Sequence, residues 1–134
     1  MRGAAALLLL AAPAAAQAPV DCEADGLAPA EIAVCAEAAW EASEGDLDLA
    51  FGLAVTGAEV LDEDRFLAGE ADGPRAAALI ERGQSDWIAH RDSHCAAEAL
   101  LEGPGPAREA LGFLCLERLN RLRIAQLGAF GPAR

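Results

Sequence analysis

Residues 95–115, CAAEALLEGPGPAREALGFLC, form the most informative pattern in this sequence. The Gly-Pro-Gly-Pro run at 103–106 is the clearest turn signal, because glycine and proline both disfavour a helix interior. Alanine, leucine and glutamate, which are good helix formers, dominate on both sides of it. Cys95 lies eight residues before this run and Cys115 nine residues after it. Two antiparallel helices with a rise of about 1.5 Å per residue would place these cysteines at nearly the same height.

Helical patterns continue from this hairpin in both directions. One helix is predicted over 75–101 and another over 107–127. A third helix is predicted to begin at Pro29, where the missing N–H costs nothing, and Glu31 in its first turn suits the helix dipole. β-branched residues, which favour strands, are scarce. We therefore expect an all-α fold, a small antiparallel bundle of three main helices.

Glycines bound the first helix in this interpretation. Gly45 is expected to interrupt it, and Gly52 or Gly57 to end it. The stretch 57–74 is then a loop with at most one short extra helix. Apolar residues at helical spacing are expected to face the core. They are Ile32, Cys35, Ala39, Trp40, Leu47 and Phe51 in the first helix, Leu79, Ile80, Trp87, Ile88, Arg91 and Cys95 in the second, and Leu111, Leu114, Cys115, Leu119, Leu122 and Leu127 in the third.

The four cysteines, Cys22, Cys35, Cys95 and Cys115, indicate disulfide bonds. An even number in a short exported chain is typical of a disulfide framework, for which three connectivities are open. Spacing favours two local bridges, Cys95–Cys115 across the hairpin and Cys22–Cys35 across the start of the first helix. No cysteine pair has the C-x2-C spacing of a zinc site.

The first 18 residues have the pattern of a cleaved signal peptide. Arg2 precedes an apolar run at 4–12, and residues 16–18 give the small-x-small pattern of a cleavage site. The run is about half as long as a membrane-spanning helix. We therefore expect residues 1–18 to be removed. The mature chain over 19–134 is expected to be a single domain, exported to the periplasm or beyond, without a membrane anchor.

The composition is strongly acidic. The full chain has 22 Asp and Glu against ten basic residues, so loss of Arg2 leaves nine arginines and a net charge of about −13. Nucleic acid is excluded as a partner, because phosphates need a cationic surface. The acids concentrate between residues 41 and 72, and Asp62, Glu63 and Asp64 are the candidate contacts for a cationic protein partner.

Catalytic and metal-binding signals are weak. His90 and His94 are one helical turn apart, and Asp86 lies one turn earlier, which is a candidate metal arrangement. Two histidines in a polar helix more often face solvent, and the sequence between them is not the H-E-x-x-H of metalloproteases. No nucleophile or phosphate-binding motif is present. We expect no enzyme activity, metal or cofactor.

Trp87 and Arg91 are also one helical turn apart. They form either a recognition patch on the surface or a structural pair. In the structural interpretation, the arginine stem packs over the aromatic ring and its guanidinium pairs with a carboxylate. The structural interpretation is favoured.

Three motifs resemble the lysozyme inhibitor LprI-like N-terminal domain family. The strongest is Gln84-x2-Trp87-x3-Arg91-Asp92-x2-Cys95. Cys35-x4-Trp40 is similar to the first motif of that family, and Cys115-x4-Asn120-x2-Arg123-x3-Leu127 to the last. The signature residues that the resemblance marks are Gln84, Trp87, Arg91, Asp92, Asn120 and Arg123.

The chain departs from the family pattern in the first and last motifs. Ser43 and Glu44 stand where the family usually has a Leu-Asp pair, Phe51 replaces a tyrosine, and Asn120 replaces a threonine. The resemblance implies an exported helical domain without catalytic residues, some of whose members act against lysozyme. Two functions follow as expectations: an inhibitor that binds a cationic lysozyme, or an accessory envelope module that binds another periplasmic partner.

Overall fold

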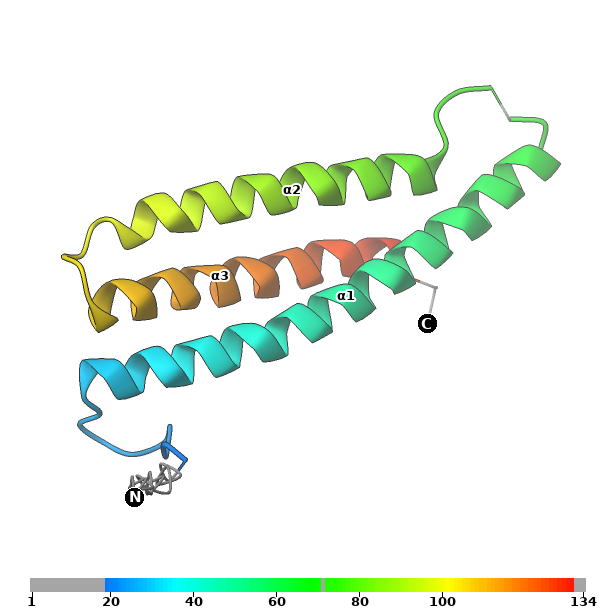
Figure 1. Ribbon diagram of the computed structural model, residues 1–134. Helices are drawn as coiled ribbons and strands as arrows, with labels where there is room; N and C mark the ends of the chain where they lie inside the picture. Colours follow the sequence, from blue (N-terminus) through cyan, green and yellow to red (C-terminus); the bar gives the residue numbers. More distant parts are fainter. Residues whose placement is uncertain (1–18, 71, 132–134) are drawn as a thin grey trace, which may run out of the picture.

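The computed structural model in Figure 1 describes residues 19–70 and 72–131. Three α-helices, α1 (Pro29–Leu67), α2 (Ala76–Ala99) and α3 (Pro106–Leu127), are followed by one 3-10 turn, η1 (Gly128–Phe130). In this view α1 and α3 run from left to right and α2 runs from right to left. The first and third helices are therefore parallel, and α2 is antiparallel to both. The described residues contain no strand, and the predicted all-α bundle is confirmed. The signal peptide expected at residues 1–18 lies outside the described residues.

Both predicted disulfides are confirmed. Cys22 is bonded to Cys35 and ties the segment before α1 to the first turns of that helix. Cys95 is bonded to Cys115, and the two Cα atoms lie 5.5 Å apart, so the bridge joins α2 and α3 at one height above their turn. Gly105 in this turn has a φ of 129°, a value that L side chains rarely adopt.

The first helix is much longer than predicted. It has 39 residues, about 58 Å at the usual rise, and runs through Gly45, Gly52 and Gly57 to Leu67. Glycine weakens a helix by about 1 kcal/mol, which packing against a neighbour outweighs. The predicted interruption at Gly45 and the end at Gly52 or Gly57 are therefore wrong. At Gly57 the reason for glycine is close packing, since a Cβ there would collide with the carbonyl oxygen of Phe130 in η1.

Small side chains dominate the core. The fully buried face of α1 follows a narrow stripe that repeats every three or four residues, as in a coiled coil. The buried apolar residues are Ala33, Ala36, Leu47, Ala54, Ala58, Ala77, Ile80, Cys95, Ala110, Cys115 and Leu127. The predictions that Ile32, Ala39, Leu79, Ile88, Leu114 and Leu122 face the core are wrong, because these residues are exposed. Alanine lets helices approach closely, so their contact stripe is narrower than the apolar pattern suggests.

We predict opposite effects of alanine at two helical glycines. Gly52 has open space around its Cα, so Gly52→Ala should raise the free energy of unfolding by about 1 kcal/mol through helix propensity alone. Gly57→Ala gains the same propensity but displaces η1 from α1, and should lower the stability of the fold. Urea denaturation of both variants measures the difference. If both substitutions stabilise the fold equally, the contact with η1 does not require glycine at position 57.

Candidate functional site

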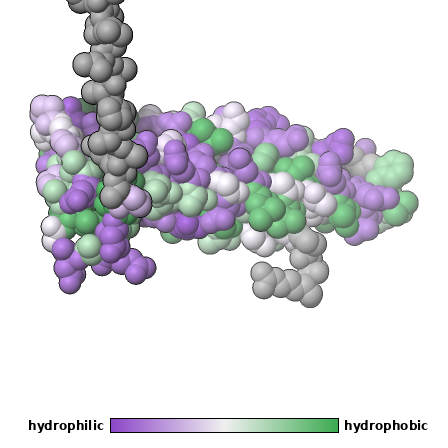
Figure 2. Space-filling view, turned by 60° about the horizontal axis from the view of Figure 1, so that its bottom comes forward, coloured by the Kyte–Doolittle hydropathy of each residue, from purple (hydrophilic) through white to green (hydrophobic). Residues whose placement is uncertain are grey.

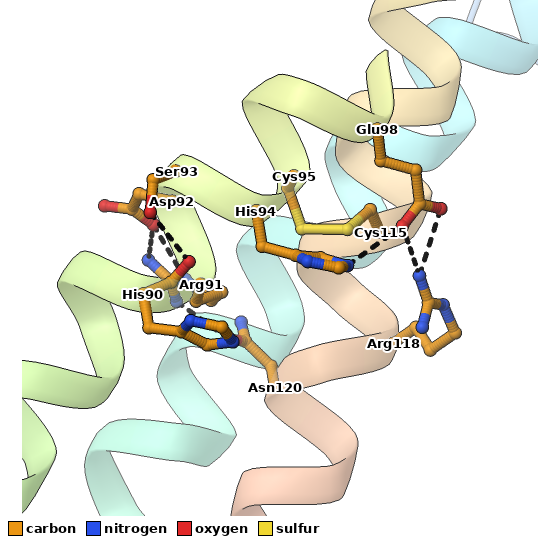
Figure 3. Close-up of a disulfide and its surroundings, with 10 residues drawn as sticks. All are labelled: His90, Arg91, Asp92, Ser93, His94, Cys95, Glu98, Cys115, Arg118 and Asn120. Atoms are coloured by element: carbon orange, nitrogen blue, oxygen red, sulfur yellow. Dashed lines mark hydrogen bonds and ion pairs between the residues drawn. A yellow bond between two sulfur atoms is a disulfide. The ribbon is translucent and has the colours of Figure 1, made fainter. Parts of the chain in front are cut away.

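A buried arginine lies where the three helices meet. Arg91 of α2 is 5% exposed. Its Nη1 donates hydrogen bonds to Glu44 Oε1 of α1 at 2.5 Å and to Asn120 Oδ1 of α3 at 2.7 Å. Its Nε donates to the neighbouring Asp92 at 2.8 Å. One guanidinium group thus contacts side chains from all three helices, and Figure 3 shows Arg91 with Asp92 and Asn120 near the disulfide.

The partners of Arg91 are hydrogen-bonded to one another. Asn120 Nδ2 donates to Ser43 Oγ and to Glu44 Oε1, both at 2.8 Å. The indole N–H of Trp40 donates to the same Glu44 oxygen at 2.9 Å. Within the described residues, no buried side-chain nitrogen or oxygen lacks a hydrogen-bond partner. The network is therefore fully satisfied, the condition under which buried polar groups stabilise one arrangement.

Two guanidinium groups lie close to the ring of Trp87. The Cζ atoms of Arg91 and Arg123 lie 5.4 and 5.6 Å from its ring centroid, within cation–π range. Arg123 Nε also donates to Gln84 Oε1 at 2.9 Å, and burial lowers the pKa of Arg123. The family signature therefore lies mainly inside the bundle. This arrangement favours the structural interpretation of Trp87 and Arg91 over a recognition patch.

A cavity of about 480 Å³ opens beside this network. None of the sequence motifs indicated it. Trp40 and Phe113 stack in its wall with ring centroids 5.3 Å apart. Gly112 forms another part of the wall, where a Cβ would lie 3.6 Å from Ala99. The glycine within an otherwise strongly helical segment was the available signal. The cavity has the size of a ligand pocket and suits an apolar group.

The three acids proposed as partner contacts have different roles in the structure. Asp62 accepts hydrogen bonds from the backbone N–H groups of Ala76 at 2.7 Å and Ala77 at 3.1 Å. It therefore caps the N-terminus of α2 from a position 14 residues earlier in the sequence. Glu63 and Asp64 are exposed. Only these two remain available to a partner.

Two arginines of α3, Arg118 and Arg121, form ion pairs with carboxylates. Arg121 pairs with Asp46 of α1 and with Glu117, and these two carboxylates raise its pKa. Arg118 pairs with Glu98 of α2 at 2.8 Å, as Figure 3 shows. These two arginines therefore link α3 to α2 and to α1.

The structure does not bring His90, His94 and Asp86 together as a group of candidate metal ligands. His90 and His94 are exposed, with ring centroids 5.8 Å apart. Among residues 19–70 and 72–131, the one group of candidate ligand atoms that lie within 4.8 Å of one another is His94, Glu98 and Cys115. Asp86 is not part of it, and the Cys115 sulfur is bonded to Cys95 and offers no thiolate. We therefore propose no metal site.

We predict that lysine cannot replace Arg91. Its single ammonium group cannot contact Glu44, Asn120 and Asp92 as the planar guanidinium does. Because a buried polar network loses a central partner, Arg91→Lys should lower the free energy of unfolding by about 3 kcal/mol. Arg82→Lys on the same helix is the control, since Arg82 is exposed and makes no side-chain hydrogen bond or ion pair within the described residues. Equal stability of the two variants in urea denaturation would contradict this role.

We predict that the cap formed by Asp62 is pH-dependent. The hydrogen bond from Ala76 is the main cause that holds the pKa of Asp62 below its ordinary value of 3.8. A lowered pKa in the folded state means that the charged carboxylate stabilises the fold at neutral pH. This contribution is lost as the pH falls below about 3.8 toward the lowered value. Asp62→Ala should lower the melting temperature at pH 7 and remove part of the acid sensitivity.

Asp64→Ala is the matched control for this cap. Its side chain is exposed on the same turn of α1, and replacing it should leave the melting temperature nearly unchanged. Thermal melts between pH 7 and pH 3 compare the two variants. A similar loss of stability in both would show that general acidity, and not the cap, is responsible.

Comparisons with known proteins identify a family for this sequence. A family model described as "Lysozyme inhibitor LprI" matches residues 22–127. An uncharacterized protein of Rhizobium meliloti (strain 1021), R02472, is 31% identical over 124 residues, which cover 90% of this chain and 86% of that protein. No solved structure matches. No helix among the described residues has the length and apolarity to cross a membrane. The match spans all three helices and all four cysteines, so the chain belongs to the LprI lysozyme inhibitor family.

Proposed function

We propose that this chain is an exported, non-enzymatic protein that binds a cationic lysozyme-type enzyme and slows its attack on peptidoglycan. The observation that carries the proposal is the family match over residues 22–127. Two disulfides suit the oxidising compartments outside the cytoplasm, where lysozymes act. The high negative charge suits a basic enzyme as partner.

Binding, and not catalysis, agrees with the chemistry of the residues. Arg91 is the buried charged group of the network, and its guanidinium is engaged by Glu44, Asp92 and Asn120. Among the candidate contact residues, Glu63 and Asp64 are exposed and can meet a cationic surface. Asp62 is better explained as the cap of α2.

We predict that the chain over residues 19–134 inhibits a cationic lysozyme in a turbidity assay on peptidoglycan, at a defined stoichiometry. Charge attraction alone fades with salt, because the screening length is about 8 Å at physiological ionic strength. A complex that also buries apolar or hydrogen-bonded groups persists under these conditions. Inhibition should therefore be strongest at low salt and remain measurable at physiological salt.

Two controls make this assay decisive. The first is an unrelated acidic protein of equal net charge, and the second is the reduced, unfolded chain. If the acidic protein inhibits equally well, or if inhibition disappears at physiological salt, the effect is charge scavenging. That result would favour the alternative function, an accessory envelope module that binds another periplasmic partner.

A further inference from the structure

The side of α1 that faces away from the core carries an unpartnered apolar row. Leu49, Leu53, Val60 and Leu67 are spaced by four, seven and seven residues, so they lie on one side of the helix. They are 66, 48, 54 and 75% exposed. Figure 2 views the molecule from the side of Figure 1 on which α1 lies, and shows hydrophobic patches along its length among hydrophilic residues. Exposed apolar rows with a polar border are typical of protein-binding surfaces.

Acidic side chains border this row. Glu63 and Asp64 are the neighbours of Val60 one helical turn away. The exposed Asp48 and Glu59 directly precede Leu49 and Val60 in the sequence. Within residues 19–70 and 72–131, none of these four carboxylates forms an ion pair. By contrast, the carboxylates of Asp46 and Asp62 already have partners in the bundle. The four free carboxylates therefore give the apolar row an uncompensated negative border.

This border selects among the occupants of the row. A second copy of the chain on the same face would bring two negative borders together, and like charges at an interface are costly. An anionic lipid surface is repelled for the same reason. A protein surface with apolar side chains among lysines and arginines is complementary in both respects. We propose that the row Leu49–Leu53–Val60–Leu67, with its acidic border, is the contact surface for the cationic partner, an inference that rests on the proposed function.

The test compares two pairs of exposed apolar residues. The variant pair Leu49→Ser with Val60→Ser removes two of the four apolar side chains of the row. The control pair is Leu100→Ser with Leu122→Ser, at the C-terminal end of α2 and in α3. These side chains are 67 and 56% exposed, close to the values for Leu49 and Val60. All four side chains are exposed, so both variants should fold, and circular dichroism checks this. Surface plasmon resonance on immobilised cationic lysozyme at physiological salt measures the affinity of each.

We expect the Leu49/Val60 pair to weaken binding at least about tenfold, mainly through faster dissociation, because apolar side chains buried at an interface carry much of its binding energy. The Leu100/Leu122 pair should bind as the parent does. Glu59→Gln with Glu63→Gln should instead slow association and flatten its salt dependence. This second variant keeps the row intact and tests the border separately.

The outcomes distinguish the two proposals. If the parent chain binds and inhibits lysozyme while both serine pairs behave alike, the contact surface lies elsewhere and only this inference fails. If the parent chain does not bind lysozyme at all, the proposed function fails and this inference with it. Sedimentation of the parent chain as a dimer that the Leu49/Val60 pair dissociates would identify a second copy as the occupant and overturn the inference.

Discussion

The burial of one positive charge constrains the whole bundle. A guanidinium group taken out of water is costly unless it is paired and its N–H groups are satisfied. Arg91 meets this condition only when Glu44 of α1 and Asn120 of α3 are both at hydrogen-bond distance. Sliding any helix by one turn, about 5.4 Å, would break these contacts. The small alanines of the core set no such requirement, so the polar network fixes the register that apolar packing leaves loose.

Two departures from the family pattern meet in this network. Ser43 and Glu44 replace the usual Leu-Asp pair, and Asn120 replaces threonine. In the fold, Asn120 Nδ2 donates to both Ser43 and Glu44. A leucine at position 43 would remove one acceptor from a fully buried amide, which is unfavourable. These departures are therefore linked by hydrogen bonds between α1 and α3. Glu44 still provides a carboxylate for Arg91.

Local signals predicted much of this fold, and long-range contacts account for the errors. The hairpin at 103–106 and both disulfides follow from short-range spacing around one turn and one helix start. The length of α1 does not, because Gly57 serves a contact with η1, 71 or more residues later in the chain. The role of Asp62 was hidden similarly, since its partners are in another helix. Of the candidate contacts, composition could identify the acidic band but not which carboxylates the bundle already uses.

The position of the signature residues limits what family membership says about binding. Arg91 and Asn120 are buried, and Trp87 is half-buried with two guanidinium groups near its ring, so the main role of these side chains is to maintain the bundle. A chain can keep this signature and the fold while its outer surface changes freely. The exposed row on α1 contains no signature residue. The choice of partner therefore depends on exposed side chains, and the buried Arg91 network sets the register of the helices that carry them.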